Sequence, residues 1–327
     1  MPLVPDLEAP VVFVHLGATP KFLYKNLEYF AEHFQTRSKV IITDNEELMD
    51  FARLGYSIIK VQDLEIEWPK DFEIMGNKSG FRNNFWFSTK ARLVILPKFM
   101  NVYKLQKLMH VESDVWLHPN FPFEKFWNID AALAYPRVDK VRGIASVLLI
   151  NGERGRELLS SACAIWPHNT DMEILGRLLE TSEDVFELPS TFVVEKNEFD
   201  DWIFDGAKLG MYLFGSDPRN NAGVIKRFRK SPLGSLPAYQ EIALENDQVV
   251  LKVDSDLRKV ANLHLHSKNR KMFSDTWQTI LKRQIRKKVL RLDYGFDIYA
   301  LVYWILEKSA QLYRKFKIVR LKYIKFF

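Results

Sequence analysis

The sequence has 327 residues, of which 47% are hydrophobic, including 24 Phe, 12 Tyr and 8 Trp. This is enough apolar surface to bury a large core, which excludes a chain that is disordered throughout. The single cysteine, Cys163, excludes an intramolecular disulfide framework and favours a reducing compartment.

The net charge of +6 is unevenly distributed along the sequence. Residues 282–327 contain thirteen Lys or Arg and three acidic residues, a net charge of +10, whereas residues 1–281 carry a net charge of −4. The first residues lack the basic region and apolar core of a signal peptide, and no run of about 18 apolar residues predicts a membrane-spanning helix. We therefore expect a cytoplasmic protein with a basic C-terminal segment.

Predicted strands and helices alternate through the first part of the sequence. Runs of β-branched and aromatic residues predict the strands, and apolar residues at helical spacing predict the helices. The strands are residues 11–16, 39–45 and 56–61, and the helices between them are residues 21–34 and 46–54. This alternation is typical of an α/β fold with a mostly parallel sheet that helices cover on both faces.

The rest of the sequence continues this pattern and then changes character. Further helices are predicted at residues 83–100, 154–165, 172–180 and 199–213, and further strands at residues 105–111, 131–135, 145–150, 248–253 and 261–266. From residue 277 onward the sequence becomes basic and amphipathic. We therefore predict an α/β domain over residues 1–276 and a basic amphipathic helical tail over residues 277–327.

An acidic triplet, Glu112-Ser113-Asp114, follows the strand predicted at residues 105–111. Open α/β sheets bind ligands at the carboxyl ends of their strands, and side chains two apart on an extended segment point the same way. Both carboxylates can therefore converge on one Mg²⁺ or Mn²⁺, a cation that bridges the oxygens of a diphosphate. Such triplets also occur by chance in solvated turns, so the preceding strand is what favours a metal site.

A second cluster, His264, His266 and Lys268, lies at the end of a late predicted strand. The two imidazoles face the same side of a strand and can ligate a metal, and the ammonium of Lys268 suits a phosphate. Two histidines are too few for a zinc site of their own. The alternative interpretation is a hydrogen-bonded core histidine beside a solvated lysine.

Three carboxylates lie among aromatic residues at Asp200, Asp201 and Asp205. On a helix Asp201 and Asp205 share a face, where they can bind acceptor hydroxyls or act as a base. Capping of a helix start explains Asp200 or Asp201 equally well, but it explains Asp205 less well. Asp205 is therefore the candidate base.

Further charged residues near the predicted strand ends suit a phosphorylated ligand. Arg82 and Arg92 flank the start of the helix at residues 83–100, and arginine binds phosphate in a bidentate manner, although ion pairs are its commoner use. Asp44 follows a strand and suits a ribose or base contact, or else a helix cap.

In this order, these motifs resemble those of bacterial GT-A glycosyltransferases that build surface polysaccharides. The resemblance covers residues 11–273. It rests on the strand-turn-helix opening with His15, on Thr43-Asp44-Asn45, on the aromatic helix with its arginines, on Glu112-Ser113-Asp114 and on the late His-x-His-Ser-Lys. It implies a GT-A, Rossmann-like fold in which the DxD-type motif, here ExD, binds a divalent metal and a nucleotide diphosphate.

The resemblance also implies a role for each motif. The implied metal ligands are Glu112, Asp114 and either His264 or His266. The implied donor contacts are Glu112 and Lys268, and the predicted donor contacts also include His15, Asp44, Arg82 and Arg92. The first acid is Glu rather than Asp, and the His-to-Lys spacing differs from the HxxGxxK pattern of glycogenin-like retaining enzymes. The resemblance therefore implies no stereochemical outcome.

The tail contains basic segments at residues 281–291 and 314–322 that flank an apolar, aromatic run at residues 298–306. The run is too short to span a bilayer, but with its flanking cations it suits the interface of an anionic membrane leaflet. Nucleic-acid binding is a weaker alternative, because no RNA or DNA module accompanies the charge. A terminal helix pair packed on the domain, with a solvated basic face, is a further alternative.

Together these features predict an enzyme that transfers a sugar from a nucleoside diphosphate donor, expected to be a UDP-sugar, to a glycan or lipid-linked acceptor at the cytoplasmic membrane face. Mn²⁺ or Mg²⁺ would stabilise the leaving diphosphate, and Asp205 is the predicted base. A nucleotidyltransferase is the first alternative, but the turn at residues 15–20 lacks the Gly-rich basic loop that a triphosphate needs. A non-enzymatic membrane or RNA tether built around the tail is the second.

Overall fold

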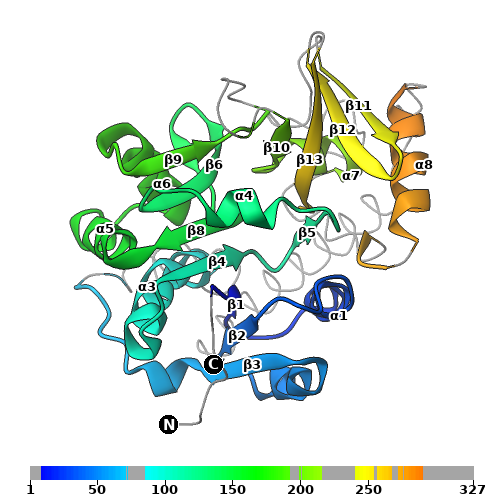
Figure 1. Ribbon diagram of the computed structural model, residues 1–327. Helices are drawn as coiled ribbons and strands as arrows, with labels where there is room; N and C mark the ends of the chain where they lie inside the picture. The colour runs from blue at the N-terminus through cyan, green and yellow to red at the C-terminus, as the bar shows by residue number, and fades with distance from the viewer. Residues whose placement is uncertain are drawn as a thin grey trace, which may run out of the picture.

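The computed structural model describes residues 9–70, 72, 85–191, 199, 201–215, 240–253, 256–266, 272–274 and 276–289. The first sheet begins with the predicted alternation of strands and helices (Figure 1). The elements are β1 (Val11–His15), α1 (Lys21–His33), β2 (Lys39–Thr43), the 3₁₀ helix η1 (Glu46–Leu54), β3 (Tyr56–Lys60) and the 3₁₀ helix η2 (Val61–Leu64). β1, β2 and β3 pair in parallel, which confirms the predicted opening.

The sheet continues in the order β3-β2-β1-β4-β8-β6-β7, with β9 beside β6. β4 is parallel to β1 and β9 to β6, whereas β8 runs antiparallel between β4 and β6. These strands are β4 (Lys107–Val111), β6 (Leu133–Asp139), β7 (Arg142–Gly143), β8 (Val147–Asn151) and β9 (Val185–Leu188). The predicted α/β class with a mostly parallel sheet is confirmed. The strand predicted at residues 145–150 is β8, but the sequence pattern did not indicate its antiparallel direction.

Helices cover both faces of this sheet, as its alternating buried residues require (Figure 1). Val11 and Phe13 pack with α1 residues in one core cluster, whereas Val12 packs with residues of the opposite helices in another. The helices on that second face are α3 (Phe85–Tyr103), α5 (Gly152–Ile165) and α6 (Asp171–Thr181). Because both faces are buried, the strand ends are the part of the sheet that can meet a ligand.

A second, smaller sheet packs beside the first, and the sequence pattern did not predict it (Figure 1). Its order is β10-β13-β12-β11, and the short strand β5 also pairs with β13. Its strands are β5 (Val115–Leu117), β10 (Trp202–Phe204), β11 (Gln240–Glu245), β12 (Gln248–Val253) and β13 (Asp256–His264). The helix α4 (Phe123–Trp127) follows β5. The apolar residues of this sheet join the core cluster under α1, so the two sheets share one interior.

The helix predicted over residues 199–213 is wrong in its first half. Residues 202–204 form β10, and α7 (Lys208–Phe214) begins only after a turn. All three residues of β10 are buried, and their backbone pairs with β13. Pairing with a strand far away in the sequence thus overrides the local helical spacing.

α8 (Trp277–Val289) is the part of the predicted tail that the structure describes, and it packs on the domain. Trp277 and Leu281 are buried in the main core cluster, and the rings of Trp277 and Trp116 lie 4.9 Å apart between centroids. The start of the segment 277–327 therefore follows the packed-helix alternative, while residues 290–327 lie outside the described residues. Within the described parts of the chain, the helices are too short or too polar to cross a membrane.

Replacing Leu281 by Ala tests whether α8 belongs to the folded body. The Leu281 side chain is fully buried, so its truncation should lower the free energy of unfolding by about 2–5 kcal/mol in urea titrations. The control Arg283→Ala removes an exposed side chain of the same helix and should change this free energy by less than about 0.5 kcal/mol. Equal unfolding midpoints for the two variants would show that α8 is an independent tail.

His118, directly after β5, is buried in its neutral form. Its Nδ1 accepts the N–H of Asn120 at 3.0 Å, and its Nε2–H donates to the carbonyl of Asp247 in the β11–β12 turn at 3.0 Å. Burial lowers the pKa of His118 to about 4, although the carbonyl and carboxylate of Asp247 partly oppose this shift. The neutral imidazole therefore joins β5 to the neighbouring hairpin.

Acidification should weaken the fold through His118. The unfolded imidazole, with a pKa of 6.5, takes up a proton that the native one does not, so this contribution is complete above pH 6.5 and is lost as the pH falls toward 4. Between about pH 7 and pH 5, the free energy of unfolding should fall by about 2 kcal/mol more in wild type than in His118→Gln. Urea titrations at each pH measure this difference, and parallel pH profiles would contradict the neutral assignment.

Candidate metal centre

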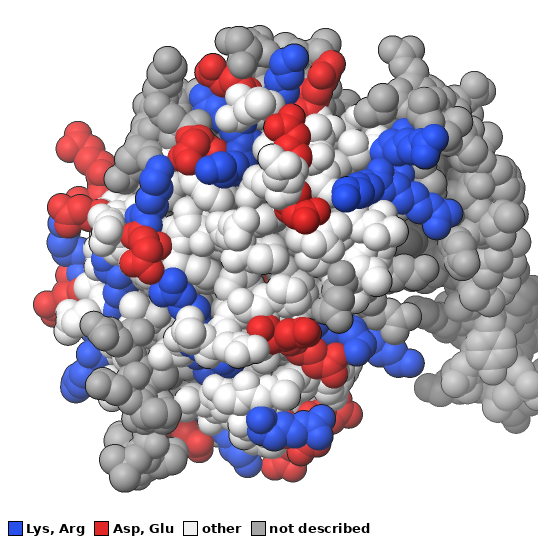
Figure 2. Space-filling model, turned by 45° about the vertical axis from the view of Figure 1, so that its right-hand side comes forward, with Lys and Arg blue, Asp and Glu red and all other residues white. Residues whose placement is uncertain are grey.

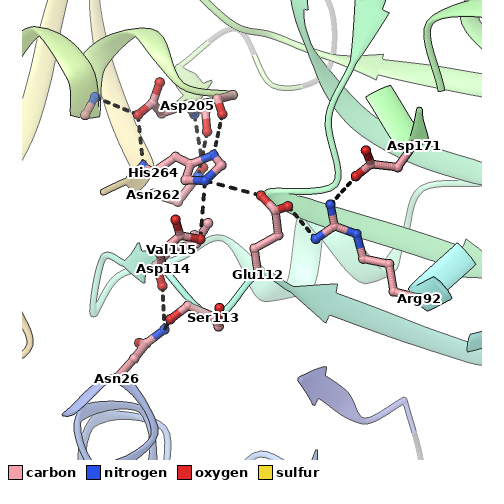
Figure 3. A network of polar contacts seen from close by, with 12 residues as sticks. Asn26, Arg92, Glu112, Ser113, Asp114, Val115, Asp171, Asp205, Asn262 and His264 are labelled. Carbon is pink, nitrogen blue, oxygen red and sulfur yellow. Dashed lines mark hydrogen bonds and ion pairs between the residues drawn. The ribbon is translucent and has the colours of Figure 1, made fainter. Parts of the chain in front are cut away.

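The acidic triplet forms the turn that joins the two sheets (Figure 3). β4 ends at Val111, and the N–H of Glu112 still donates to the carbonyl of Ser146 beside it at 3.2 Å. The N–H of Val115 then donates to the carbonyl of Glu112 at 3.1 Å, and β5 begins. The carboxylates of Glu112 and Asp114 therefore lie at the carboxyl end of β4.

Asn26 on α1 holds this turn in place. Its Nδ2 donates to the carbonyls of Ser113 and Val115, both at 3.0 Å. The sequence interpretation did not single out Asn26. The signal that would have found it is a polar residue on the buried, otherwise apolar side of a helix, next to Leu27.

Pairing between β5 and β13 brings His264 to the triplet. In the antiparallel register His264 lies opposite Val115, and the N–H of Leu265 donates to the carbonyl of Asp114 at 2.8 Å. The imidazole Nε2 lies 3.3 Å from Asp114 Oδ1 and 3.4 Å from Glu112 Oε2. One possible ligand atom from each of the three residues lies within 4.8 Å of the other two.

The orientation of the His264 ring fits a metal ligand. Its Nδ1 lies 2.6 Å from the carbonyl oxygen of Gly206, so Nδ1 carries a proton, and Nε2 is the ring nitrogen that faces the two carboxylates. These groups repel one another unless a proton or a cation lies between them. A backbone carbonyl on the far ring nitrogen is the usual partner of a metal-ligating histidine, and the mixed oxygen and nitrogen donors suit a cation such as Mn²⁺.

Arg92 on α3 lies between two buried carboxylates (Figure 3). Its Nη1 pairs with Glu112 Oε1 and its Nη2 with Asp171 Oδ2. Burial alone would lower the pKa of Arg92, but the two carboxylates raise it above its ordinary value, so the side chain stays charged. Of the two uses predicted for Arg92, phosphate contact and ion pair, the structure shows the ion pair. Asp171 was not predicted, because only the packing of α6 against α3 brings it here.

The formal charges of this cluster do not balance. Glu112, Asp114 and Asp171 are each less than 10% exposed and contribute three negative charges against the single positive charge of Arg92. Buried charges are costly unless they are paired. When His264 is neutral, as in a metal ligand, a divalent cation would supply the two missing positive charges, which is the second indication that these residues fit a metal.

Asp44, directly after β2, and His15, the last residue of β1, hold the turn after β1. The N–H of Gly17 donates to Asp44 Oδ1 at 2.7 Å, and His15 Nε2 lies 3.1 Å from the carbonyl oxygen of Ala18. The helix cap that the sequence left open for Asp44 falls instead to Asn45, whose side chain accepts a hydrogen bond at the start of η1. Contact of Asp44 and His15 with a donor stays a prediction.

The structure gives the two late histidines different surroundings. His264 faces the carboxylates, and the ring of His266 stacks on it with centroids 4.1 Å apart and planes 25° from parallel. Among the described residues, the clustered ligand atoms are those of Glu112, Asp114 and His264, which favours His264 over His266. Lys268 and Arg82, the predicted phosphate contacts, lie outside the described residues.

Asp205 is fully buried in the turn between β10 and α7. Its Oδ1 accepts a hydrogen bond from the N–H of Leu209, and its Oδ2 accepts two more, from Gly210 and His264. Burial raises the pKa of Asp205, and these N–H groups oppose the shift only in part. A catalytic base needs a carboxylate oxygen that can reach an acceptor hydroxyl. Both oxygens of Asp205 are instead bound to backbone N–H groups, so this geometry does not favour the predicted base role.

No protein-family model and no curated protein matches the sequence. Among solved structures, the chain is similar to the glycosyltransferase GlyE of Streptococcus pneumoniae TIGR4, with a TM-score of 0.40 and 16% identity over 57% of this chain and 46% of GlyE. It is also similar to the galactosyltransferase LgtC in complex with donor and acceptor sugar analogs, with a TM-score of 0.47 and 11% identity over 83% and 99% of the two chains. A cytidylyltransferase from Leptospira borgpetersenii serovar Hardjo-bovis gives a TM-score of 0.35 and 12% identity over 59% and 83%. The chain thus spans less than half the length of GlyE.

Replacing Arg92 by Leu tests the buried ion pairs. The change leaves the carboxylates of Glu112 and Asp171 unpaired, so the free energy of unfolding measured in EDTA should fall by about 3–5 kcal/mol. Adding Asp171→Asn should recover part of this loss. The control Lys125→Ala removes an exposed ion pair with Asp201, at 3.0 Å, and should cost less than about 1 kcal/mol. Wild-type stability of Arg92→Leu would contradict the pairing.

Proposed function

We propose that this protein is a divalent-metal-dependent glycosyltransferase whose donor is a nucleoside diphosphate sugar. The observation that carries the proposal is the direction of His264, whose Nδ1 is bound to a backbone carbonyl while Nε2 faces the carboxylates of Glu112 and Asp114. These three residues would hold Mn²⁺ or Mg²⁺ at the end of β4, where a sheet of this kind meets its ligands.

The arrangement suits the departure of a diphosphate. A cation held there would stabilise the negative charge that develops on the leaving group. Arg92 forms an ion pair with Oε1 of Glu112, and Oε2 is the oxygen directed toward His264. Asn26 fixes the backbone of the turn on either side of Asp114. Ligands fixed in this way need little rearrangement when the metal and the donor bind.

The ends of β1 and β2 support a nucleoside contact beside the metal. Both strands are parallel to β4, and their register places His15 opposite Thr43. His15 and Asp44 therefore lie at the same edge of the sheet as the acidic triplet. In the proposal Asp44 contacts the ribose or base of a UDP-sugar, and Lys268 and Arg82 contact its phosphates.

The outer side of α8 supports a membrane-associated acceptor. Lys282, Arg283 and Arg286 are exposed on α8, whereas Leu281 and Ile285 are buried beneath them. A helix with this distribution suits an anionic membrane surface. We therefore include in the proposal a glycan or lipid-linked acceptor and a peripheral position on the cytoplasmic membrane face.

Two alternatives receive less support. A nucleotidyltransferase needs a basic, Gly-rich loop after the first strand. Here Asp44 and Asn45 hold that turn instead: Asp44 Oδ1 accepts the N–H of Gly17 at 2.7 Å, and Asn45 Nδ2 donates to the Gly17 carbonyl at 3.0 Å. A nucleic-acid tether would favour a basic surface. Figure 2 shows Lys and Arg mixed with Asp and Glu over the described part of one face, with a broad uncharged area between them.

Metal titration and donor hydrolysis test the proposal. Wild type is expected to bind Mn²⁺ in isothermal titration calorimetry and to hydrolyse one class in a panel of nucleotide sugars, with loss of turnover in EDTA. Asp114→Asn should lower this turnover by more than about 100-fold, because it weakens a ligand of the ion that stabilises the leaving group.

The matched control is Glu124→Gln. Glu124 is an exposed carboxylate whose Oε1 lies 3.1 Å from Arg37, so its replacement should leave the turnover unchanged. Full metal-dependent turnover by Asp114→Asn would refute the assigned centre. Pyrophosphate release from a nucleoside triphosphate, without hydrolysis of any nucleotide sugar, would identify a nucleotidyltransferase instead.

A further inference from the structure

The Asp205 carboxylate connects two backbone segments, the start of α7 and the end of β13, beside the metal centre (Figure 3). Its Oδ1 accepts the N–H of Leu209 at 3.0 Å, and its Oδ2 accepts the N–H groups of Gly210 at 2.8 Å and His264 at 3.0 Å. Backbone donors of this kind offset the cost of burying a carboxylate. The same hydrogen bonds fix the start of α7 and the end of β13 relative to each other.

Asn262 fixes the backbone of Asp205 in turn. The N–H of Asp205 donates to Asn262 Oδ1 at 3.1 Å, and Asn262 Nδ2 donates to the Asp205 carbonyl at 2.9 Å. The regular register between β10 and β13 shifts at Ile203 and Phe204. Directly after this shift, the Asn262 amide takes the place of ladder hydrogen bonds and keeps Asp205 against β13.

The residue after Asp205 fixes the His264 ring. The Gly206 carbonyl accepts the hydrogen bond from His264 Nδ1 at 2.6 Å. Asp205 thus holds the backbone of His264, and its neighbour Gly206 sets the tautomer and the ring direction. Together the two contacts direct Nε2 toward Asp114 and Glu112.

Gly210 shows how closely α7 and His264 meet. A Cβ atom at this position would lie 2.0 Å from the His264 carbonyl oxygen and 3.2 Å from Asp205 Oδ2. Only glycine permits this approach. The chain therefore places α7 directly against the backbone of His264, where the Asp205 carboxylate can reach both.

We propose that Asp205 is a positioning residue, which holds His264 in the orientation required of a metal ligand. The inference rests on the proposed metal site and replaces the base role expected from the sequence. Asp205 acts through the backbone of His264 and through Gly206, so its loss should weaken metal binding rather than the chemical step. Residues that orient a metal ligand in this way change metal affinity by about 10- to 100-fold when they are replaced.

The test is Asp205→Asn, which keeps the side-chain size but turns an amide NH₂ toward backbone donors. Its Kd for Mn²⁺ should rise by about 10- to 100-fold in isothermal titration calorimetry. The Mn²⁺ concentration for half-maximal turnover should rise in parallel, and saturating Mn²⁺ should restore most of kcat. A catalytic base would give the opposite result, an unchanged Kd for Mn²⁺ and a loss of kcat that Mn²⁺ cannot restore.

Asp201→Asn is the matched control. Asp201 lies on the same segment, but its partly exposed carboxylate pairs with Lys125 and Lys259 at 3.0 Å and 3.6 Å. The same chemical change there should leave the Kd for Mn²⁺ unchanged. An equal rise in Kd for both variants would reduce the effect to general loosening of the fold and would overturn the proposal.

A second variant and an NMR measurement also test the role of Asp205. If Asp205→Asn does not fold, Asn262→Ser removes the support of Asp205 and should also raise the Kd for Mn²⁺. The ¹⁵N chemical shift of His264 Nδ1 in metal-free protein, assigned with His264→Gln, should show a hydrogen-bonded Nδ1–H in wild type that is lost in the Asp205 or Asn262 variant. If wild type binds no Mn²⁺, the proposed function fails while this shift still decides the role of Asp205. An unchanged shift in the folded variants would overturn it.

Discussion

The short antiparallel pairing between β5 and β13 is the contact on which the candidate centre depends. β5 has only three residues, yet it carries the chain from the first sheet into the second directly after Glu112-Ser113-Asp114. Its register sets His264 opposite Val115, so the imidazole meets the two carboxylates without a long side chain. A slip of one residue would turn the imidazole to the other face of β13 and remove it from the centre.

Buried carboxylates on the two sides of His264 are stabilised in different ways. Glu112 shares a guanidinium with Asp171, and the cluster keeps excess negative charge that attracts a cation. Asp205 accepts hydrogen bonds from three backbone N–H groups, and these fixed dipoles stabilise its buried carboxylate. The first arrangement suits the binding of a cation, and the second keeps the backbone around His264 rigid. His264 contacts both, because its ring faces the first group and its backbone is bound to the second.

Local patterns predicted the parts of the fold and site that depend on local structure. The spacing of apolar residues predicted β1, β2, β3 and α1, and the strand before Glu112 predicted where the triplet lies. The second sheet was beyond such patterns, because β10 lies in a segment with helical spacing and pairs with β13 only in the folded chain. Asp171 was missed for the same reason, whereas Asn26 was missed although its place on the apolar side of α1 was a local signal. Asp205 was singled out from its aromatic surroundings, but its contacts depend on which backbone groups meet its oxygens.

The distance along the chain between the candidate ligands has a consequence for the order of folding. His264 follows Glu112 by about 150 residues, so the centre is a contact of high sequence separation. During synthesis both acids leave the ribosome long before β13, and they acquire their imidazole only when the second sheet has formed. An ion bound there would close this long loop like a cross-link and would oppose its opening. Its occupancy would then report that β13 is in place.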